Sequence, residues 1–148
     1  MIHEFSRTEL LIGEEGLRRL GASSILIFGV GGVGSHCIEA LARCGAGRLI
    51  LVDNDDVAVS NINRQAVAYQ DTVGRPKTEV MKEIIAHISP KIQVHTIRSF
   101  VLPDNLEALM DAIPEEFLPL DYVVDAIDTV SAKLAIAEYC HARSIPLI

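Results

Sequence analysis

The feature that most constrains this chain is a glycine-rich turn between an apolar strand and a helix. The β-branched, apolar segment 24–29 is followed by segment 33–44, which has the pattern of a helix, and four glycines lie in or beside the turn: Gly29, Gly31, Gly32 and Gly34. Side chains at such a turn would keep a phosphate group away from the backbone N–H groups at the start of the helix. The turn therefore predicts the beginning of a nucleotide-binding βαβ unit.

An acidic residue at the end of the second strand supports this interpretation. The apolar segment 48–53 ends on Asp53, nineteen residues after Gly34. A carboxylate at the tip of this strand can accept hydrogen bonds from both hydroxyl groups of a ribose. A strand before the glycines, a helix after them and an acid at the next strand tip together favour a nucleotide site over a glycine-rich turn without a ligand.

Strands and helices alternate along the remainder of the chain, which predicts an α/β fold. We expect helices at 76–88, 104–112 and 130–143, strands at 92–98 and 122–127, and a fifth strand that starts at Ile145. Helices that alternate with fully apolar strands indicate a Rossmann-like, doubly wound, mainly parallel sheet with helices on both faces. Before the first strand, residues 3–20 predict an amphipathic helix whose apolar face contains Leu10, Leu11, Leu17 and Leu20.

The length and the ending of the chain bear on its domain organisation. Its 148 residues suit one domain with a full core. The chain stops within the apolar segment 144–148, without a turn or a polar tail. Because a strand rarely ends a native domain so abruptly, we expect residues 1–148 to be one domain whose C-terminal part is missing.

Composition narrows the possible partners and location. Apolar residues make up 49% of the chain, and no apolar run approaches the ~20 residues that span a bilayer, so we expect a globular chain without a membrane segment. The three cysteines form no Cys-x-x-Cys pair, and an odd count indicates reduced thiols in a cytoplasm. The net charge is −7, and no tract is rich in lysine and arginine. A self-sufficient nucleic-acid-binding protein would show a basic stripe, so either the substrate is small or a missing segment supplies positive charge.

The long polar connection after the second strand, residues 54–73, indicates the chemistry, because connections of this length in a compact domain are usually functional. Arg64 lies in this connection and Lys77 lies just after it. Two cations there could hold the β- and γ-phosphates of ATP, whereas a nicotinamide enzyme needs no such pair in this region. The alternative is that both are exposed surface cations, as most arginines and lysines are.

Two acids, Asp125 and Asp128, come at the end of the fourth strand. Ligands of open α/β sheets bind at the carboxyl ends of the strands, where the glycines and Asp53 also lie. A carboxylate that faces a triphosphate there is a natural Mg²⁺ ligand, which favours Asp128 as the metal-binding residue. Asp128 could also cap the helix 130–143, and for Asp125 capping or a structural hydrogen bond is the favoured role.

In combination, these motifs resemble the ThiF/MoeB/HesA family, the bacterial relatives of ubiquitin-activating (E1) enzymes. The resemblance covers essentially the whole chain and rests on Gly29-x-Gly31-Gly32-x-Gly34, Asp53-x-Asp55-x-Val57-x-x-Ser60-Asn61-x-Asn63-Arg64-Gln65, Val73-Gly74-x-x-Lys77 and Asp125-x-x-Asp128. Within the family the chain looks most like the tRNA threonylcarbamoyladenosine dehydratase branch, on Asn61-x-Asn63-Arg64-Gln65, Leu102-Pro103-Asp104-Asn105, Asp125-Ala126-Ile127-Asp128 and Ile145-Pro146-Leu147.

The resemblance implies an E1-like domain that adenylates a carboxylate with ATP and Mg²⁺. Carried over by motif, the glycines face the nucleotide, Asp53 binds the ribose, and Asp128 serves the magnesium ion. The residues expected around the phosphates and the rest of the nucleotide are Asp55, Ser60, Asn61, Arg64, Gln65 and Lys77. The resemblance implies a catalytic role for Arg64, Lys77 and Asp128.

The resemblance also implies partners. Phe5-Ser6-Arg7 resembles the family's N-terminal segment, whose arginine reaches into the site of the partner subunit, so the resemblance implies a homodimer with a catalytic Arg7. In the dehydratase branch, the activated carboxylate belongs to a threonyl group on a tRNA adenosine, and its carbamoyl group then closes a ring with net loss of water. In ThiF and MoeB, the carboxylate is the C-terminal glycine of a ubiquitin-like sulfur carrier protein, with a sulfur-transfer partner.

Two hypotheses of other classes remain open from the sequence. An NAD-dependent oxidoreductase would explain the glycines and Asp53, but it would leave Arg64, Lys77 and the asparagines without a role. A non-catalytic nucleotide-binding scaffold is the second. The family's C-terminal part, which in some branches contains zinc-binding cysteines, has no counterpart in these residues.

Overall fold

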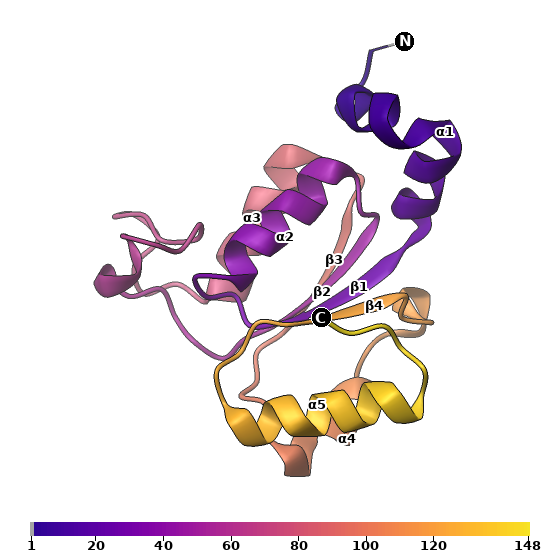
Figure 1. Ribbon diagram of the computed structural model, residues 1–148. Coiled ribbons are helices and arrows are strands. Elements are labelled where there is room, and N and C mark those ends of the chain that lie inside the picture. Colours follow the sequence, from indigo (N-terminus) through magenta and orange to yellow (C-terminus); the bar gives the residue numbers. More distant parts are fainter. Residues whose placement is uncertain (1) are drawn as a thin grey trace.

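The computed structural model describes residues 2–148, and its centre is a four-stranded parallel sheet (Figure 1). The strands are β1 (Ser24–Phe28), β2 (Arg48–Val52), β3 (Gln93–Ile97) and β4 (Tyr122–Asp125). Their order in the sheet is β3-β2-β1-β4, and every neighbouring pair is parallel. The chain therefore moves outward from β1 to β3 on one side and crosses to β4 on the other, which opens a crevice where the order reverses.

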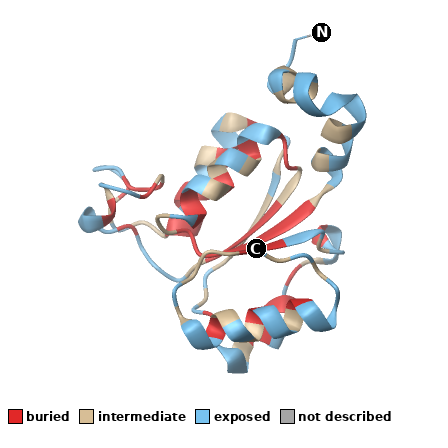
Figure 2. Cartoon of the chain, viewed as in Figure 1, coloured by how far each residue is buried: buried red, intermediate tan, exposed pale blue. Residues whose placement is uncertain are grey.

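Helices cover both faces of this sheet, as the alternation of elements predicts. On one face lie α2 (Gly34–Cys44) and α3 (Lys77–Ile88), and on the other lie α4 (Leu106–Asp111) and α5 (Val130–Ala142) (Figure 1). Side chains of a strand point alternately to its two faces, so each strand contributes to two hydrophobic cores. Figure 2 shows the strands at the centre as the most buried part of the chain. The prediction of a doubly wound, Rossmann-like fold is confirmed.

In place of the fifth strand expected from Ile145, the structure has an isolated bridge at the edge of the sheet. Leu147 pairs with Val123 in a parallel bridge, and the amide of Asp125 donates to the carbonyl of Ile148 at 2.8 Å. This segment therefore lies along the free edge of β4. Within residues 2–148, no helix combines the length and the apolar character needed to cross a membrane.

The first helix differs from its prediction. It runs over α1 (Ser6–Ala22) and is kinked at Gly13, where φ is 74°. Leu17 and Leu20 are half-buried, but Leu10 and Leu11 are 75% and 87% exposed, so only half of the predicted apolar face is packed against the rest of the chain. The residues that lead into the helix contact the ends of α2 and α3, since Phe5 lies against Gly45 and Ser89 Oγ donates to Glu4 at 3.1 Å (Figure 1).

Candidate functional site

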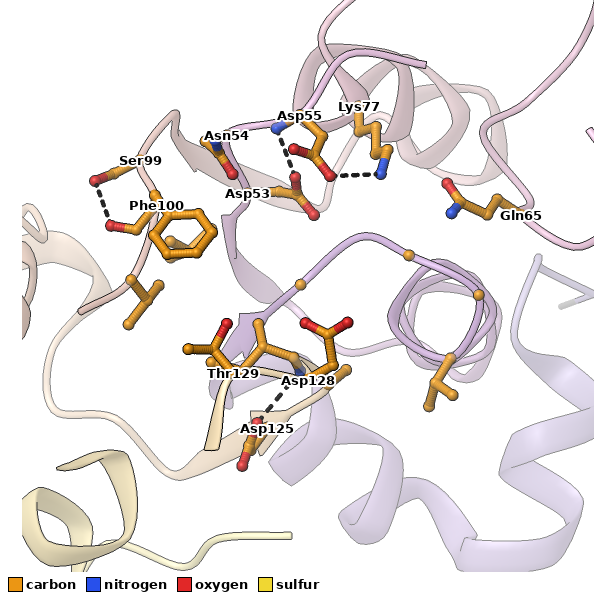
Figure 3. A pocket seen from close by; sticks show the side chains of 18 of the residues that line it. Asp53, Asn54, Asp55, Gln65, Lys77, Ser99, Phe100, Asp125, Asp128 and Thr129 are labelled. Atoms are coloured by element: carbon orange, nitrogen blue, oxygen red, sulfur yellow. Dashed lines mark hydrogen bonds and ion pairs between the residues drawn. The ribbon is translucent and has the colours of Figure 1, made fainter. Parts of the chain in front are cut away.

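A cavity of about 890 Å³ lies at the carboxyl ends of the four strands. Its walls are formed by the connections that follow β1, β2, β3 and β4 and by the first turn of α3 (Figure 3). In the view of Figure 3, Asp53, Asp55 and Lys77 lie on one side and Asp125, Asp128 and Thr129 on the other. This is the position at which open α/β sheets bind their ligands.

Most of the residues predicted from the sequence meet at this cavity. Those that line it are Gly29, Gly31, Gly32, Asp53, Asp55, Asn61, Arg64, Gln65, Lys77 and Asp128. Three do not line it. Gly34 lies inside the first turn of α2, Ser60 is exposed in a 3₁₀ turn, Val59–Asn61, and Arg7 is exposed on α1.

The glycines of the turn have two different roles. A Cβ atom at Gly34 would lie 1.9 Å from the carbonyl oxygen of Gly29, so this glycine allows the helix to approach the turn. A Cβ atom at Gly31 would meet nothing nearer than Gln65 Nε2 at 3.9 Å, and one at Gly32 nothing nearer than Arg64 Cγ at 3.7 Å. The backbone of Gly31 and Gly32 is therefore open toward the cavity, as close approach of a phosphate requires.

Asp53 joins the tip of β2 to the glycine turn. Its Oδ2 accepts a hydrogen bond of 2.7 Å from the amide of Val30, and its Oδ1 accepts one of 2.8 Å from the amide of Asp55. These bonds hold the carboxylate in one orientation at the cavity wall. A carboxylate has about four acceptor positions, so two remain for the hydroxyl groups of a ribose.

Lys77 is a buried cation rather than a surface one. Its side chain is only 6% exposed, and its Nζ lies 3.1 Å from Oδ2 of Asp55, which comes from the connection after β2. A buried ammonium group is tolerated only with a partner of opposite charge. Arg64 is exposed, and its Nη1 donates to the carbonyl of Ser60 at 2.8 Å and to Asn63 Oδ1 at 3.0 Å.

Two buried amide side chains complete this wall. The Oδ1 atom of Asn61 accepts a hydrogen bond of 2.9 Å from the amide of Ala58 and so shapes the connection after β2. Gln65 is also buried, and its Oε1 has no hydrogen-bond partner among the described residues. A buried amide oxygen without a partner is costly, so its position beside Gly31 fits a cavity that receives a polar ligand.

The two acids after β4, Asp125 and Asp128, have different surroundings. Asp125 is 10% exposed, its Oδ1 accepts from the amide of Ile127 at 3.3 Å, and its Oδ2 lies 2.8 Å from Lys133 Nζ. The expected structural hydrogen bond of Asp125 is thus confirmed. Asp128 is exposed at the cavity, but the N-cap of α5 is Thr129, which makes no capping hydrogen bond through its side chain. The alternative role of Asp128, as the cap of this helix, is therefore contradicted.

Sequence reasoning missed the part of the wall that follows β3. Ser99, Phe100 and Val101 line the cavity, and Phe100 is half-exposed there. The rule that ligands bind at the carboxyl ends of strands, applied above to the first, second and fourth strands, would have found these residues on the third. Asn54 and Lys133 also line the cavity.

The charges at the cavity limit how a metal ion could bind. Within residues 2–148, no three His, Cys, Asp or Glu side chains are grouped as metal ligands. Mg²⁺ commonly binds through one or two carboxylates together with phosphate oxygens of a substrate. The donor set at the cavity suits that mode, because four carboxylates and three cations line it: Asp53, Asp55, Asp125, Asp128, Arg64, Lys77 and Lys133.

Known proteins are similar to this chain in sequence and fold. The chain is 47% identical over 148 residues to the tRNA threonylcarbamoyladenosine dehydratase of Bacillus subtilis (strain 168). The alignment covers 100% of this chain and 56% of that protein. It is 34% identical over 146 residues to the sulfur carrier protein ThiS adenylyltransferase of Escherichia coli (strain K12), covering 97% of this chain and 55% of the relative. The chain thus spans about half the length of the curated relatives it matches.

The structural comparison agrees with the sequence comparison. The crystal structure of E. coli tRNA N6-threonylcarbamoyladenosine dehydratase in complex with ATP matches with a TM-score of 0.90 at 44% identity, covering 97% of this chain and 57% of that one. The model of the ThiF family matches residues 5–148. The resemblance inferred from the motifs is confirmed, and the chain belongs to the ThiF family.

Proposed function

We propose that residues 1–148 form the ATP-binding domain of an adenylating enzyme whose substrate is the carboxylate of N6-threonylcarbamoyladenosine in tRNA. The observation that carries this proposal is the buried ammonium group of Lys77 at the wall of a cavity lined by glycines, with Asp128 on the opposite side. A cation and a carboxylate that face each other across a nucleotide cavity suit a triphosphate with its metal ion. The 47% identity to a tRNA threonylcarbamoyladenosine dehydratase supports the substrate.

Each predicted residue has a role in this proposal that its position supports. Gly31 and Gly32 present open backbone to the phosphates, and Asp53 accepts from the ribose hydroxyls. Arg64 and Lys77 hold the phosphates beyond the glycines. Asp128 would hold a Mg²⁺ ion, which would neutralise negative charge on the phosphates.

The reaction is a transfer of the adenylyl group. A carboxylate oxygen of the substrate forms a bond to the α-phosphorus of ATP, while the bond from that phosphorus to the bridging oxygen breaks and pyrophosphate leaves. Arg64 and Lys77 stabilise the charge that gathers on the leaving pyrophosphate. In the second step the carbamoyl oxygen of the substrate forms a bond to the activated carbonyl carbon, the bond from that carbon to the AMP oxygen breaks, and a carbamoyl N–H proton is released to solvent. AMP takes one carboxylate oxygen with it, so the substrate loses the elements of one water overall.

A second candidate is adenylation of the C-terminal glycine of a ubiquitin-like sulfur carrier, on which a sulfur-transfer partner would then act. The ThiS adenylyltransferase relative, at 34% identity, supports it less strongly than the dehydratase supports the first. An NAD-dependent oxidoreductase would leave Lys77 and Arg64 without a function. We also propose a cytoplasmic location, which suits the three free cysteines.

The nucleotide preference tests this function. We expect the full-length protein to bind ATP with Mg²⁺ and not to bind NAD, because the cations at the cavity match a triphosphate. Titration calorimetry with both ligands measures this. Binding of NAD without binding of ATP would refute adenylation, and ATP–pyrophosphate exchange with the modified tRNA or a carrier protein as acceptor then separates the two candidates.

We further propose that the enzyme is a homodimer in which Arg7 acts in the partner's site. Arg7 lies on α1, which leads into the amino end of β1, whereas the cavity lies at the carboxyl ends of the strands (Figure 1). Leu10 and Leu11 beside it are exposed, as residues at an interface between subunits would be in one isolated chain. A guanidinium group binds phosphate oxygens in a forked geometry, which suits Arg7 for this role.

A mixing experiment tests the role of Arg7. We expect Arg7→Ala and Asp128→Ala proteins to be inactive alone, and their mixture to recover about a quarter of the parent activity. Half of randomly mixed dimers contain both chains, and each of these has one intact site of two. Arg19→Ala, an exposed arginine on the same helix, is the control and should keep its activity. A mixture that stays inactive would place Arg7 outside the partner's site.

A further inference from the structure

The side chain of Lys133 connects the beginning of α5 to the loop that precedes this helix. Lys133 lies near the start of α5, and its Nζ donates to the carbonyl oxygen of Ile127 at 3.1 Å and pairs with Asp125 Oδ2 at 2.8 Å. The same Asp125 carboxylate accepts from the amide of Ile127 through its other oxygen. Lys133 therefore closes a ring of interactions around residues 125–127.

The other side of this loop is held by the glycine turn. The amide of Ala126 donates to the carbonyl of Phe28 at 2.8 Å, and a Cβ atom at Gly29 would lie 2.6 Å from the carbonyl oxygen of Ala126. The loop is thus confined between the turn after β1 and the ammonium group of Lys133. Removing that group would free one side of the loop and leave the largely buried Asp125 carboxylate without its cation.

Asp128 depends on this loop for its position. Its side chain makes no hydrogen bond or ion pair with any other residue in the described part of the chain, and it is exposed at the cavity. A side chain without a hydrogen bond or an ion pair of its own takes its position mainly from its backbone. Lys133 is therefore the cation that fixes the segment immediately before Asp128.

We propose that Lys133 is a positioning residue that holds Asp128 where it can meet a magnesium ion on the nucleotide phosphates. This rests on the proposed function, which makes Asp128 the metal-binding residue. Groups that orient a metal ligand without touching the metal commonly change metal affinity or activity by about 10- to 100-fold when they are removed. Lys133 is thus expected to affect the use of Mg²⁺ and not only the stability of the fold.

The test measures how Mg²⁺ acts on ATP binding in the full-length protein. Calorimetry gives the ATP affinity with saturating Mg²⁺ and with a chelator, and pyrophosphate exchange gives the Mg²⁺ concentration for half-maximal rate. For Lys133→Met we expect this Mg²⁺ concentration to rise about tenfold or more, and the tightening of ATP binding by Mg²⁺ to fall by a similar factor. Lys91→Met, at an exposed lysine outside the cavity, is the matched control and should leave both quantities unchanged.

A double variant separates position from charge. Asp125→Asn with Lys133→Met removes one negative and one positive group, so the cavity keeps its net charge but loses the ring of interactions. We expect the double variant to remain defective in its response to Mg²⁺. If it regains the parent's response, the charge of Lys133 matters rather than its contacts, and the proposal is overturned. Should Lys133→Met fail to fold, Lys133→Gln takes its place: its amide can still donate to Ile127 but loses the ion pair with Asp125, so the Mg²⁺ concentration for half-maximal rate should still rise.

The parent protein distinguishes this proposal from the proposed function. A parent whose ATP binding does not respond to Mg²⁺ would overturn both. A parent that responds, together with a folded Lys133→Met protein that responds equally, would overturn the role of Lys133 alone. Thermal unfolding of each variant, followed by circular dichroism, establishes that the proteins compared are folded.

Discussion

Replacing Lys77 by alanine will lower the turnover of ATP–pyrophosphate exchange in the full-length protein by about 100- to 1,000-fold, the usual cost of one well-placed electrostatic group. The Lys77 ammonium group is buried at the cavity wall and paired with Asp55. The leaving pyrophosphate gathers negative charge in the transition state, so a fixed cation there acts on the rate more than on ATP binding. Steady-state kinetics and calorimetry measure the two effects separately.

The pattern of these losses identifies the role of Lys77. A similar rate loss is expected for Arg64→Ala, because Arg64 lines the same wall. Lys91→Ala removes an exposed lysine outside the cavity and should change neither quantity. Equal losses in ATP affinity and in turnover for Lys77→Ala would mean that this cation binds the ground state and the transition state alike, which would contradict its catalytic role.

Gly34→Ala will destabilise the fold by about 3 kcal/mol, the upper end of the usual range for inserting atoms into a packed site. The added Cβ atom would lie 1.9 Å from the carbonyl oxygen of Gly29, which is backbone and cannot turn aside. Gly29 itself packs against Ala126, so a shift of the turn would also disturb the loop after β4. Urea unfolding followed by circular dichroism measures the free energy of unfolding.

Gly31→Ala is the matched control within the same turn. A Cβ atom there would come no nearer than 3.9 Å to Gln65 Nε2, so the fold should keep its stability. The added methyl group would instead stand between the backbone and the phosphates, and ATP affinity should fall. If Gly34→Ala proves as stable as the parent, helix α2 can move away from the turn, and the close packing does not require glycine.

Local sequence patterns predicted the strands and the glycine turn correctly, because each of these patterns arises from a single physical requirement. The central strands β1 and β2 are apolar runs because both faces of the sheet are covered. The turn after β1 required glycine at Gly29, where φ is 95°, and at Gly34, where the backbone of the turn is too close for a side chain. The leucines of α1 were predicted as an apolar face, yet half of that face is exposed. Periodicity shows that a face is apolar but does not show which surface covers it.

The sequence by itself determined the βαβ unit, the acid at the tip of β2 and most, but not all, of the residues that meet at the carboxyl ends of the strands. Only the tertiary structure decided which of these pair. Lys77 is buried against Asp55, twenty-two residues away, and Phe100 reaches the same cavity from the end of β3. The ring of Asp125, Ile127 and Lys133 likewise appears only in three dimensions. Such pairs depend on the register of the parallel strands and on how each connection crosses the sheet, and neither is written in the periodicity of a single segment.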